Sequence, residues 1–413
     1  MHDGKQLAAW LDELGAITDE PGRLTRTFLS PAMRAANARV AEWMRGAGLA
    51  VREDPVGNLI GRLEAAPRPR GRAKTLLLGS HLDTVRDAGR FDGALGVLLP
   101  IVALAELRRR GIALPFAVEV LGFSEEEGVR FASAYLGSKG FAGRLLAADL
   151  APTDRAGVSV RAALEAHGGG RFAVPRAAHR RRDLLGYVEV HIEQGPVLEA
   201  EGLALGVVSA IAGQARGWLT FTGKAGHAGT TPMALRRDAL AGAAELVLAA
   251  EALARASAPL VATVGVIEAR PGAPNVIPGE TTVSLDVRHP ADAARRRALR
   301  ELLGAARAIA RRRGLACAWR ATQDNGAVTG DAGLRARLGE SVRAVQGRSL
   351  ELVSGAGHDA VVVSALAPVA MLFVRCRDGL SHHPDEYASP RDLDAALRAM
   401  IDFLGRMAQQ HAE

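Results

Sequence analysis

Cysteine is nearly absent from this sequence: among 413 residues only Cys317 and Cys376 occur. Two thiols exclude a fold held together by several disulfides, and they also exclude a cysteine-rich zinc finger. We expect both to be small, buried hydrophobic residues.

Lysine is rare too, with only four residues, so the net charge of +7 comes almost entirely from arginine. Arginine triplets occur at 108–110, 180–182, 295–297 and 311–313. No interleaved aromatic residues or DNA-reading motif accompany them, so we do not expect nucleic acid to be a partner. We interpret the triplets as solvated helix ends or as a bias in composition. A weak attraction for anions is the alternative.

Long apolar runs are missing as well. The longest run without a charge, Leu95–Ala105, is far shorter than the roughly 20 residues that cross a bilayer. The first residues, MHDGKQLAAWLDELGA, contain acidic side chains and no apolar core of the signal-peptide type. We therefore expect a cytoplasmic protein without a membrane partner.

The composition is that of a globular protein, with 48% hydrophobic and 23% charged residues. A chain of 413 residues is too long for one ordinary core, so two domains are expected.

The first part of the chain has an α/β pattern. The strand Thr75–Leu78, the helix Leu95–Arg109 and the strand Phe116–Phe123 form a βαβ unit. Further elements are expected around it, with only partial helix at 142–182: a helix at 31–48 and strands at 50–52, 58–63, 185–192, 203–212 and 369–374.

From Gln214 the pattern changes to β-α-β-β-α-β, the ferredoxin-like order. The expected strands are 216–222, 260–268, 281–287 and 316–319, and the expected helices are 233–254 and 291–312. The α/β pattern resumes at Asp331 and ends with a helix at 389–408. We predict an α/β catalytic domain with a central mixed sheet flanked by helices (1–213 and 329–413). Into it is inserted an α+β lid or dimerisation domain (214–328).

The stretch SHLDTVRDAGRFDGALGV at 80–97 is the first candidate site. His81 and Asp83 follow an apolar strand, and Asp92 lies between Phe91 and Gly93. A carboxylate in such a loop can approach a cation closely and bridge two, while Asp83 is placed to accept the other ring N–H of His81. A polar turn is the alternative.

Three adjacent carboxylates, Glu125, Glu126 and Glu127, follow the apolar strand that ends at Phe123. They would repel one another unless a cation or a shared proton relieved them. Consecutive side chains diverge, so one glutamate can bind a metal while its neighbour holds the attacking water. A solvated acidic loop is the alternative.

Two further segments carry histidine. His191 lies on a strand with Glu189 and Glu193 on the same face, and His382 follows the apolar strand 369–374. A core histidine and a polar surface loop are the respective alternatives. Together the four segments supply imidazole and carboxylate without thiolate, which suits Zn²⁺ or Mn²⁺. Paired metal ions are the usual arrangement for hydrolysing amides and phosphates.

These segments resemble the dinuclear-metal amidohydrolases related to aminoacylase and carboxypeptidase G. The resemblance is strongest to the branch with allantoate amidohydrolase, N-carbamoyl-L-amino acid hydrolase and β-ureidopropionase. It covers nearly the whole chain: GSHLDTV, FDGALGV, EEEGVRF, VHIEQGPVLE, GQARGWLTFTGKAGHAGTTPM, APNVIPGE, SGAGHDA and GLSHHPDE.

The resemblance implies a two-metal site, with Asp92 as the bridge. His81 and His191 would complete one metal site, and Glu127 and His382 the other. By the same resemblance Glu126 is the general base and later the acid, and Asp83 orients His81.

The resemblance also implies roles for residues near the substrate. His227 in the inserted domain would stabilise the oxyanion across the interface of a homodimer. Asn275 and Arg288 would bind the substrate carboxylate, for which a guanidinium fork is suited. An ordinary salt bridge is the alternative for Arg288. Gln194, Gln214 and His358 resemble further pocket residues.

Among substrates the resemblance favours allantoate, because TRTFLSPA at 25–32 is most similar to allantoate-acting members. An N-carbamoyl-L-amino acid is the alternative. A peptidase or aminoacylase is a third choice, because His191 favours the carbamoyl and ureido branch. A metal-free binding protein of the same fold is disfavoured by the intact set of five ligand candidates.

Overall fold

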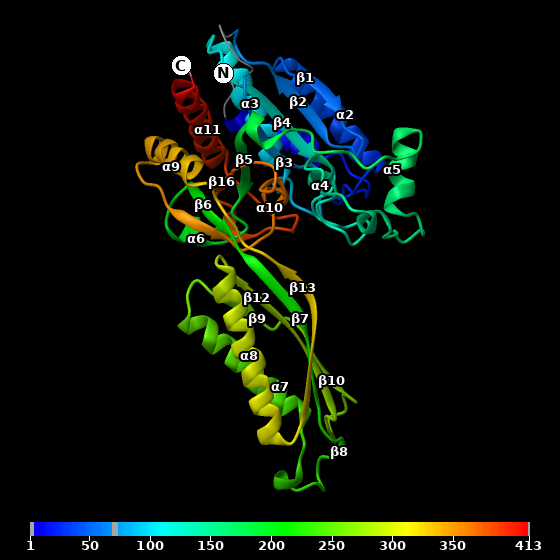
Figure 1. Cartoon of the computed structure of the whole chain (residues 1–413). Coiled ribbons are helices and arrows are strands. Elements are labelled where there is room, and N and C mark those ends of the chain that lie inside the picture. Colours follow the sequence, from blue (N-terminus) through cyan, green and yellow to red (C-terminus); the bar gives the residue numbers. More distant parts are fainter. Residues whose placement is uncertain (1–3, 68–72, 412–413) are drawn as a thin grey trace. The chain divides into compact units, whose positions relative to one another are not determined.

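The computed structural model describes residues 4–67 and 73–411, and the chain divides into two compact units (Figure 1). The first unit contains the residues up to Ser209 and from Gly330 onward, and the second unit is Ala210–Thr329. The roles predicted for the two domains stay predictions.

The first unit is built on a mixed sheet with the order β1-β2-β4-β3-β5-β16-β6, and β15 pairs with β6. Strands β4, β3, β5 and β16 are parallel to their neighbours in this group, whereas β1, β2 and β6 pair antiparallel. The predicted central mixed sheet is thereby confirmed. The strands are β1 Ala50–Glu53, β2 Leu59–Leu63, β3 Thr75–His81, β4 Ala117–Phe123, β5 Leu184–Ile192, β6 Leu205–Ile211, β15 Glu351–Ser354 and β16 Val369–Val374.

Helices flank this sheet. The central one, α3, is buried along nearly its whole length and lies against β3 and β5, with α1 and α11 packed on it. Two short helices, α4 and α10, contact each other, and α10 also contacts β5 and β16. The helices are α1 Gly4–Gly15, α2 Pro31–Gly46, α3 Ala94–Arg109, α4 Leu136–Phe141, α5 Val160–Gly168, α6 Val197–Ala200, α9 Ala332–Gln346, α10 Asp359–Val363 and α11 Pro390–Gln410.

Local capping explains where two long helices begin. Ser30 precedes α2 and its hydroxyl accepts the N–H of Met33. Ser389 precedes α11 and accepts the N–H of Asp392. In both helices proline occupies the first position, where no N–H is needed. Serine followed by proline is therefore the start signal for both.

The second unit has the predicted ferredoxin-like order. Its sheet runs β10-β12-β7-β13, and β9 also pairs with β12. All these pairings are antiparallel, and α7 and α8 pack on the sheet. The elements are β7 Gly213–Thr222, α7 Ala239–Ala256, β9 Val261–Thr263, β10 Ile267–Arg270, β12 Glu280–His289, α8 Asp292–Arg313 and β13 Ala316–Asn325, with a small pair formed by β8 Gly226–His227 and β11 Val276–Ile277.

Three element predictions in this unit are wrong in detail. The strand predicted at 316–319 continues to Asn325 as β13. The helix predicted from residue 233 begins at Ala239, because the Asp238 carboxylate caps its first turn. The strand predicted at 260–268 is two strands, since the Ser284 hydroxyl accepts the N–H groups of Gly265 and Val266 and interrupts the ladder.

The interpretation of the arginine triplets as helix ends holds for two of the four. The triplets at 108–110 and 311–313 close α3 and α8. The triplet at 295–297 lies near the start of α8, where Arg295 is buried and pairs with Asp292 and Asp324. The triplet at 180–182 enters a short 3₁₀ helix, Arg181–Asp183. Among the described residues, no helix is both long and apolar enough to span a bilayer.

Candidate metal centre

The candidate metal ligands of the first unit lie at one edge of the sheet. His81 is the last residue of β3, Glu127 follows β4 closely, His191 is the penultimate residue of β5, and His382 is in the loop after β16. These four strands are parallel, so their carboxyl ends meet at the same edge, which is where open α/β sheets bind ligands.

Asp92 lies at the centre of this group. Its Oδ1 is 3.4 Å from His81 Nε2 and 3.0 Å from His191 Nε2, while its Oδ2 is 3.2 Å from His382 Nε2. His382 Nε2 is also 3.5 Å from Glu127 Oε1. One carboxylate thus faces two imidazoles with one oxygen and a third imidazole with the other.

Three groups of side chains have ligand atoms within 4.8 Å of one another and could each hold a metal ion. The first contains His81, Asp92 and His191, and another contains Asp92, Glu127 and His382. These two groups share Asp92 and have the same members as the two predicted metal sites. The third group adds Glu126 to His81 and Glu127.

Gly93 is what allows Asp92 to come so close to His81. Its φ is +66°, in the left-handed region, and a Cβ at this position would lie 2.4 Å from the His81 ring. Helix α3 begins at the next residue, so the Asp92 carboxylate also lies near a helix N-terminus, where negative charge is favoured.

Asp83 contacts both predicted catalytic segments. His81 Nδ1 lies 3.0 Å from the Asp83 backbone oxygen and 3.5 Å from its carboxylate. The two carboxylate oxygens accept the backbone N–H groups of Glu126 at 3.0 Å and Glu127 at 3.1 Å. Asp83 therefore anchors the acidic loop as well as lying beside His81.

A hydrogen-bond network behind Asp92 escaped the sequence analysis. Gln194 Nε2 donates to Asp92 Oδ2 at 3.0 Å, and the Ser381 hydroxyl lies 3.1 Å from the same oxygen. Glu386 accepts the N–H groups of Phe91 and Asp92 at 2.9 and 3.0 Å. The only signal for Glu386 was its place in the HHPDEY segment. Gln194, predicted to line the substrate pocket, contacts a predicted metal ligand.

Arg26 is a second residue that sequence reasoning missed. Its side chain is 1% exposed, and it donates to the backbone oxygens of Leu82, Leu14 and Ile17 at 2.6, 3.0 and 3.1 Å. The backbone N–H of Arg26 also donates to the Thr84 hydroxyl. Arg26 thus holds the chain on both sides of Asp83. Burial lowers its pKa to about 10, although Asp83 and Asp19 act in the opposite direction.

The acidic loop is buried and not solvated. Glu125 is 1% and Glu126 8% exposed. Burial raises the pKa of Glu126 well above its usual value, and neighbouring carboxylates add to the effect. Burial together with the charge of Asp92 raises the pKa of Glu127 to about 7. The solvated-loop alternative for this segment is therefore wrong.

The three histidines around Asp92 have raised pKa values, which favours their charged form. Burial alone would lower the pKa of His81 and of His191, but the nearby carboxylates outweigh it and raise both. The hydrogen bond with Asp92 raises the pKa of His382 to about 9. Despite burial, these three imidazoles hold the pKa of Asp92 well below its usual range. The site thus favours positive charge between its carboxylates.

The donor set fits a divalent cation. It consists of three imidazoles and at least two carboxylates, without thiolate, and such a mixture suits Zn²⁺ or Mn²⁺. Glu125 is not part of these groups, and burial raises its pKa well above the usual value.

The strand that carries His191 has two glutamates with other partners. Glu189 accepts the Ser80 hydroxyl at 2.7 Å and the N–H of Ala360 at 3.0 Å. Glu193 accepts N–H groups at the start of α6. Among the residues that the structure describes, neither belongs to a group that could hold a metal, so they do not support His191 in the way that was expected.

His358 lies beside the candidate centre. Its ring makes an edge contact with His191 at a centroid distance of 4.5 Å, and its Nε2 is 2.7 Å from the Ser354 hydroxyl. Burial and the nearby His191 lower the pKa of His358 well below its usual value, so this ring is neutral.

The other four predicted site residues belong to the second unit, where they form two pairs. Gln214 and Arg288 face each other across β7 and β12, and both bind Asp286. The salt bridge that was the alternative for Arg288 is therefore present. His227 lies opposite Val276 in the β8–β11 pair, and Asn275 accepts the N–H of Ala228 with its backbone oxygen.

Comparisons with known proteins show which family the chain resembles. The family model described as Peptidase family M20/M25/M40 matches residues 77–406. Allantoate deiminase of Arabidopsis thaliana is 40% identical over 430 residues, which cover 97% of this chain and 81% of that protein. N-carbamoyl-L-amino acid amidohydrolase of Geobacillus stearothermophilus is 36% identical, with coverage of 99% and 100%.

A solved structure is similar over nearly the full length. It is an amidase of the hydantoinase/carbamoylase family from Burkholderia multivorans, with a TM-score of 0.92, 35% identity and 98% coverage of both chains. The resemblance stated from the sequence motifs is thereby confirmed. The chain belongs to the M20/M25/M40 peptidase family, in the branch that contains allantoate and N-carbamoyl-L-amino acid amidohydrolases.

Proposed function

We propose that this chain is a metal-dependent hydrolase that cleaves a ureido or carbamoyl C–N bond of a small carboxylate substrate. The favoured substrate is allantoate, with release of ammonia and CO₂. The observation that carries the proposal is the position of Asp92 between His81 and His191 on one side and His382 on the other.

Two divalent metal ions, Zn²⁺ or Mn²⁺, are the proposed cofactors. His81, His191 and Asp92 would hold one ion, and Asp92, Glu127 and His382 the other. When bound, such ions lower the pKa of water and stabilise negative charge on a carbonyl oxygen.

Glu126 is the proposed general base. It adjoins the ligand candidate Glu127, is 8% exposed, and can be grouped with His81 around one centre. Burial raises its pKa, which brings a carboxylate closer to the range where proton transfer is efficient at neutral pH. Glu126 would take a proton from the attacking water and return it to the leaving nitrogen.

The second unit is proposed to complete the site as a lid and as the interface of a homodimer. His227 would stabilise the oxyanion, while Arg288 and Asn275 would bind the substrate carboxylate. Gln194, Gln214 and His358 are proposed to line the pocket. Arg288 is already paired with Asp286, so a substrate carboxylate would have to share or replace that partner.

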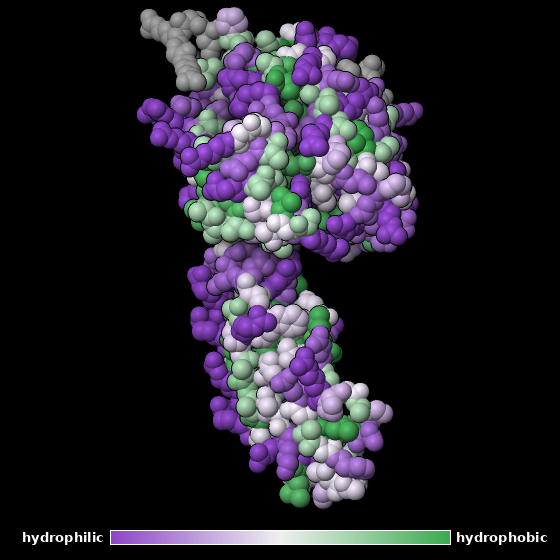
Figure 2. All heavy atoms as spheres, turned by 90° about the vertical axis from the view of Figure 1, so that its right-hand side faces the viewer, coloured by the Kyte–Doolittle hydropathy of each residue, from purple (hydrophilic) through white to green (hydrophobic). Residues whose placement is uncertain are grey.

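Exposed apolar side chains support the interface. Leu248 on α7, Val261 on β9 and Ile267 on β10 are 64%, 55% and 47% exposed. Figure 2 shows pale and green side chains on the visible face of the second unit. Contact between two copies through this unit would remove such side chains from water. The cytoplasmic location stays a prediction from the sequence.

An N-carbamoyl-L-amino acid is the second candidate substrate, and β-ureidopropionate is related to it. The Geobacillus relative named for N-carbamoyl-L-amino acids matches over the full length of both proteins, which supports this alternative. Allantoate stays first because the relative named for it has the higher identity. Aminoacylase or dipeptidase activity is less favoured.

A substrate panel tests the proposal. Metal-stripped protein would be supplied with Mn²⁺ or Zn²⁺ and assayed for ammonia release from allantoate and from N-carbamoyl-amino acids. We expect the greatest kcat/KM with allantoate and no turnover without added metal. Because allantoate and N-carbamoyl groups both yield ammonia, an inactive panel in the presence of bound metal would contradict the proposed reaction.

A further inference from the structure

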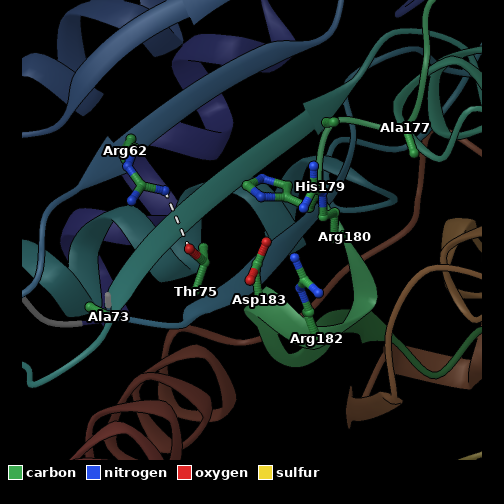
Figure 3. A pocket seen from close by; sticks show the side chains of 9 residues that line it. Arg62, Ala73, Thr75, Ala177, His179, Arg180, Arg182 and Asp183 are labelled. Carbon is green, nitrogen blue, oxygen red and sulfur yellow. Dashed lines mark hydrogen bonds between the residues drawn. The ribbon is translucent and has the colours of Figure 1, made fainter. Parts of the chain in front are cut away.

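A cavity with a volume of about 510 Å³ lies in the first unit (Figure 3). Its polar lining residues are Arg62, Thr75, His179, Arg180, Arg182 and Asp183, and three alanines complete the wall. The alanines leave the interior open, because their side chains end at Cβ. The arginine triplet at 180–182, which does not end a long helix, contributes two of its three members.

This cavity is separate from the candidate metal centre. Thr75 is the first residue of β3 and Asp183 directly precedes β5, so the cavity lies at the amino ends of these strands. His81 and His191 lie at the opposite ends. Strand β3 has seven residues, and a rise of about 3.3 Å per residue separates Thr75 from His81 by about 20 Å.

A buried carboxylate fixes one wall of the cavity. Glu119 on β4 is 2% exposed, and its two oxygens lie 3.1 Å from Arg62 Nη1 and 2.8 Å from His179 Nε2. Arg62 also donates to the Thr75 hydroxyl, the bond drawn in Figure 3. Arg62 and His179 are therefore held in position before any ligand arrives.

The remaining cationic side chains are not neutralised. Arg180 and Arg182 are exposed, and neither forms an ion pair with a carboxylate of the described residues. Asp183 is the single acidic side chain in the described lining. Arg181, between the two, does not line the cavity and donates instead to the Ser364 backbone oxygen. The cavity thus presents mainly N–H donors.

We infer that this cavity binds a small organic anion, with Arg180 and Arg182 as the charged contacts. A guanidinium group pairs with a phosphate or carboxylate through two parallel hydrogen bonds. The volume lies within the range of about 300–1,000 Å³ that is usual for small-molecule sites, so the ligand is of metabolite size and larger than a bare ion. The inference does not depend on the proposed hydrolase function.

Titration calorimetry on the full chain tests this inference. The probes are ribose 5-phosphate for a phosphate ester, succinate for a carboxylate, and ribose as the neutral control. We expect saturable binding of at least one anion but not of ribose, with an affinity that falls as NaCl is raised. The anion that binds with the higher affinity shows whether the cavity prefers a phosphate ester or a carboxylate.

Charge-matched variants locate the binding. The double variant R180Q/R182Q should weaken binding at least tenfold, whereas R155Q/R171Q, which removes two exposed arginines elsewhere in the same unit, should bind like the wild type. The single variants R182Q and R181Q give a second comparison within one triplet, and thermal melting checks the fold of each. The inference is overturned if neither anion saturates the wild type, or if R180Q/R182Q and R155Q/R171Q bind with equal affinity.

Discussion

The carboxylate of Asp83 accepts the backbone N–H of Glu126 at a distance of 3.0 Å. The residue expected only to orient His81 therefore also fixes the segment that carries the proposed general base. Since Asp83 accepts a second N–H from Glu127, its two oxygens are occupied by the acidic loop.

Replacing Asp83 by asparagine should disturb both partners. The side-chain amide nitrogen of the variant would face one of the two backbone N–H groups, of Glu126 or Glu127, that the carboxylate accepts. Two donors cannot pair, so the loop would have to move. We expect metal affinity or kcat/KM to fall by roughly 10–100-fold, the usual effect of losing a residue that supports a metal ligand. Steady-state kinetics and metal titration measure it. Asp87→Asn is a suitable control, because Asp87 has a φ of +53° that asparagine tolerates.

Replacing Glu126 by glutamine should leave the metal bound and remove the general base. We expect kcat to fall by roughly 10²–10⁴, the usual contribution of general acid–base catalysis. Metal content per chain, measured by elemental analysis, should match the wild type. Near-normal turnover in Glu126→Gln would show that another group moves the proton.

Replacing Arg26 by methionine should lower both stability and activity. The buried oxygens of Leu82, Leu14 and Ile17 would lose their donor, at a cost on the order of 3 kcal/mol in the free energy of unfolding. Because Arg26 holds the residues that flank Asp83, kcat should fall in the fraction that stays folded. Urea denaturation and kinetics measure the two effects. The exposed Arg23→Met should leave both unchanged.

Metal affinity should depend steeply on pH. The pKa of His382 is raised to about 9 and that of Glu127 to about 7 in the metal-free chain, and both must lose a proton to bind metal. On lowering the pH from 9 to 7, affinity for Mn²⁺ should fall by up to about tenfold per pH unit, and more steeply below 7. Chelator competition at several pH values measures it, and a flat profile would contradict these two ligands.

Removing the metal should destabilise the protein most at alkaline pH. The pKa values of His382 and Glu127 are higher in the folded chain than their ordinary values. The stability that comes from their protons is present in acid and is lost as the pH rises through about 7 and then about 9. The melting temperature of the metal-free protein should therefore fall from pH 6 to 9, and saturating Mn²⁺ should reduce the fall.

Two inactive variants should complement each other if His227 acts across a homodimer. Glu126→Gln and His227→Ala would each lower activity strongly. When the two variants are mixed, unfolded and refolded together, hybrid dimers form. Each hybrid dimer contains one site with both residues intact, so part of the activity should return. If each subunit uses its own His227, mixing the variants should restore nothing.

Much of the fold followed from local patterns. The apolar strands of the first unit and the β-α-β-β-α-β order of the second were predicted, because alternation and helical spacing are local properties. The start of α7 and the division between β9 and β10 were not. They depend on single side chains, Asp238 and Ser284, whose hydrogen bonds compete with the regular ladder.

The chemistry available to the site could be predicted from the order of the amino acids: imidazole and carboxylate groups follow apolar strands, and the chain has almost no thiol. Only the tertiary structure brought Asp92 between three histidines, placed Arg26 behind Asp83 and gathered Arg180 and Arg182 around a cavity. The physical reason is that these contacts join residues far apart in the chain, and their distances are set by strand pairing and core packing rather than by local spacing.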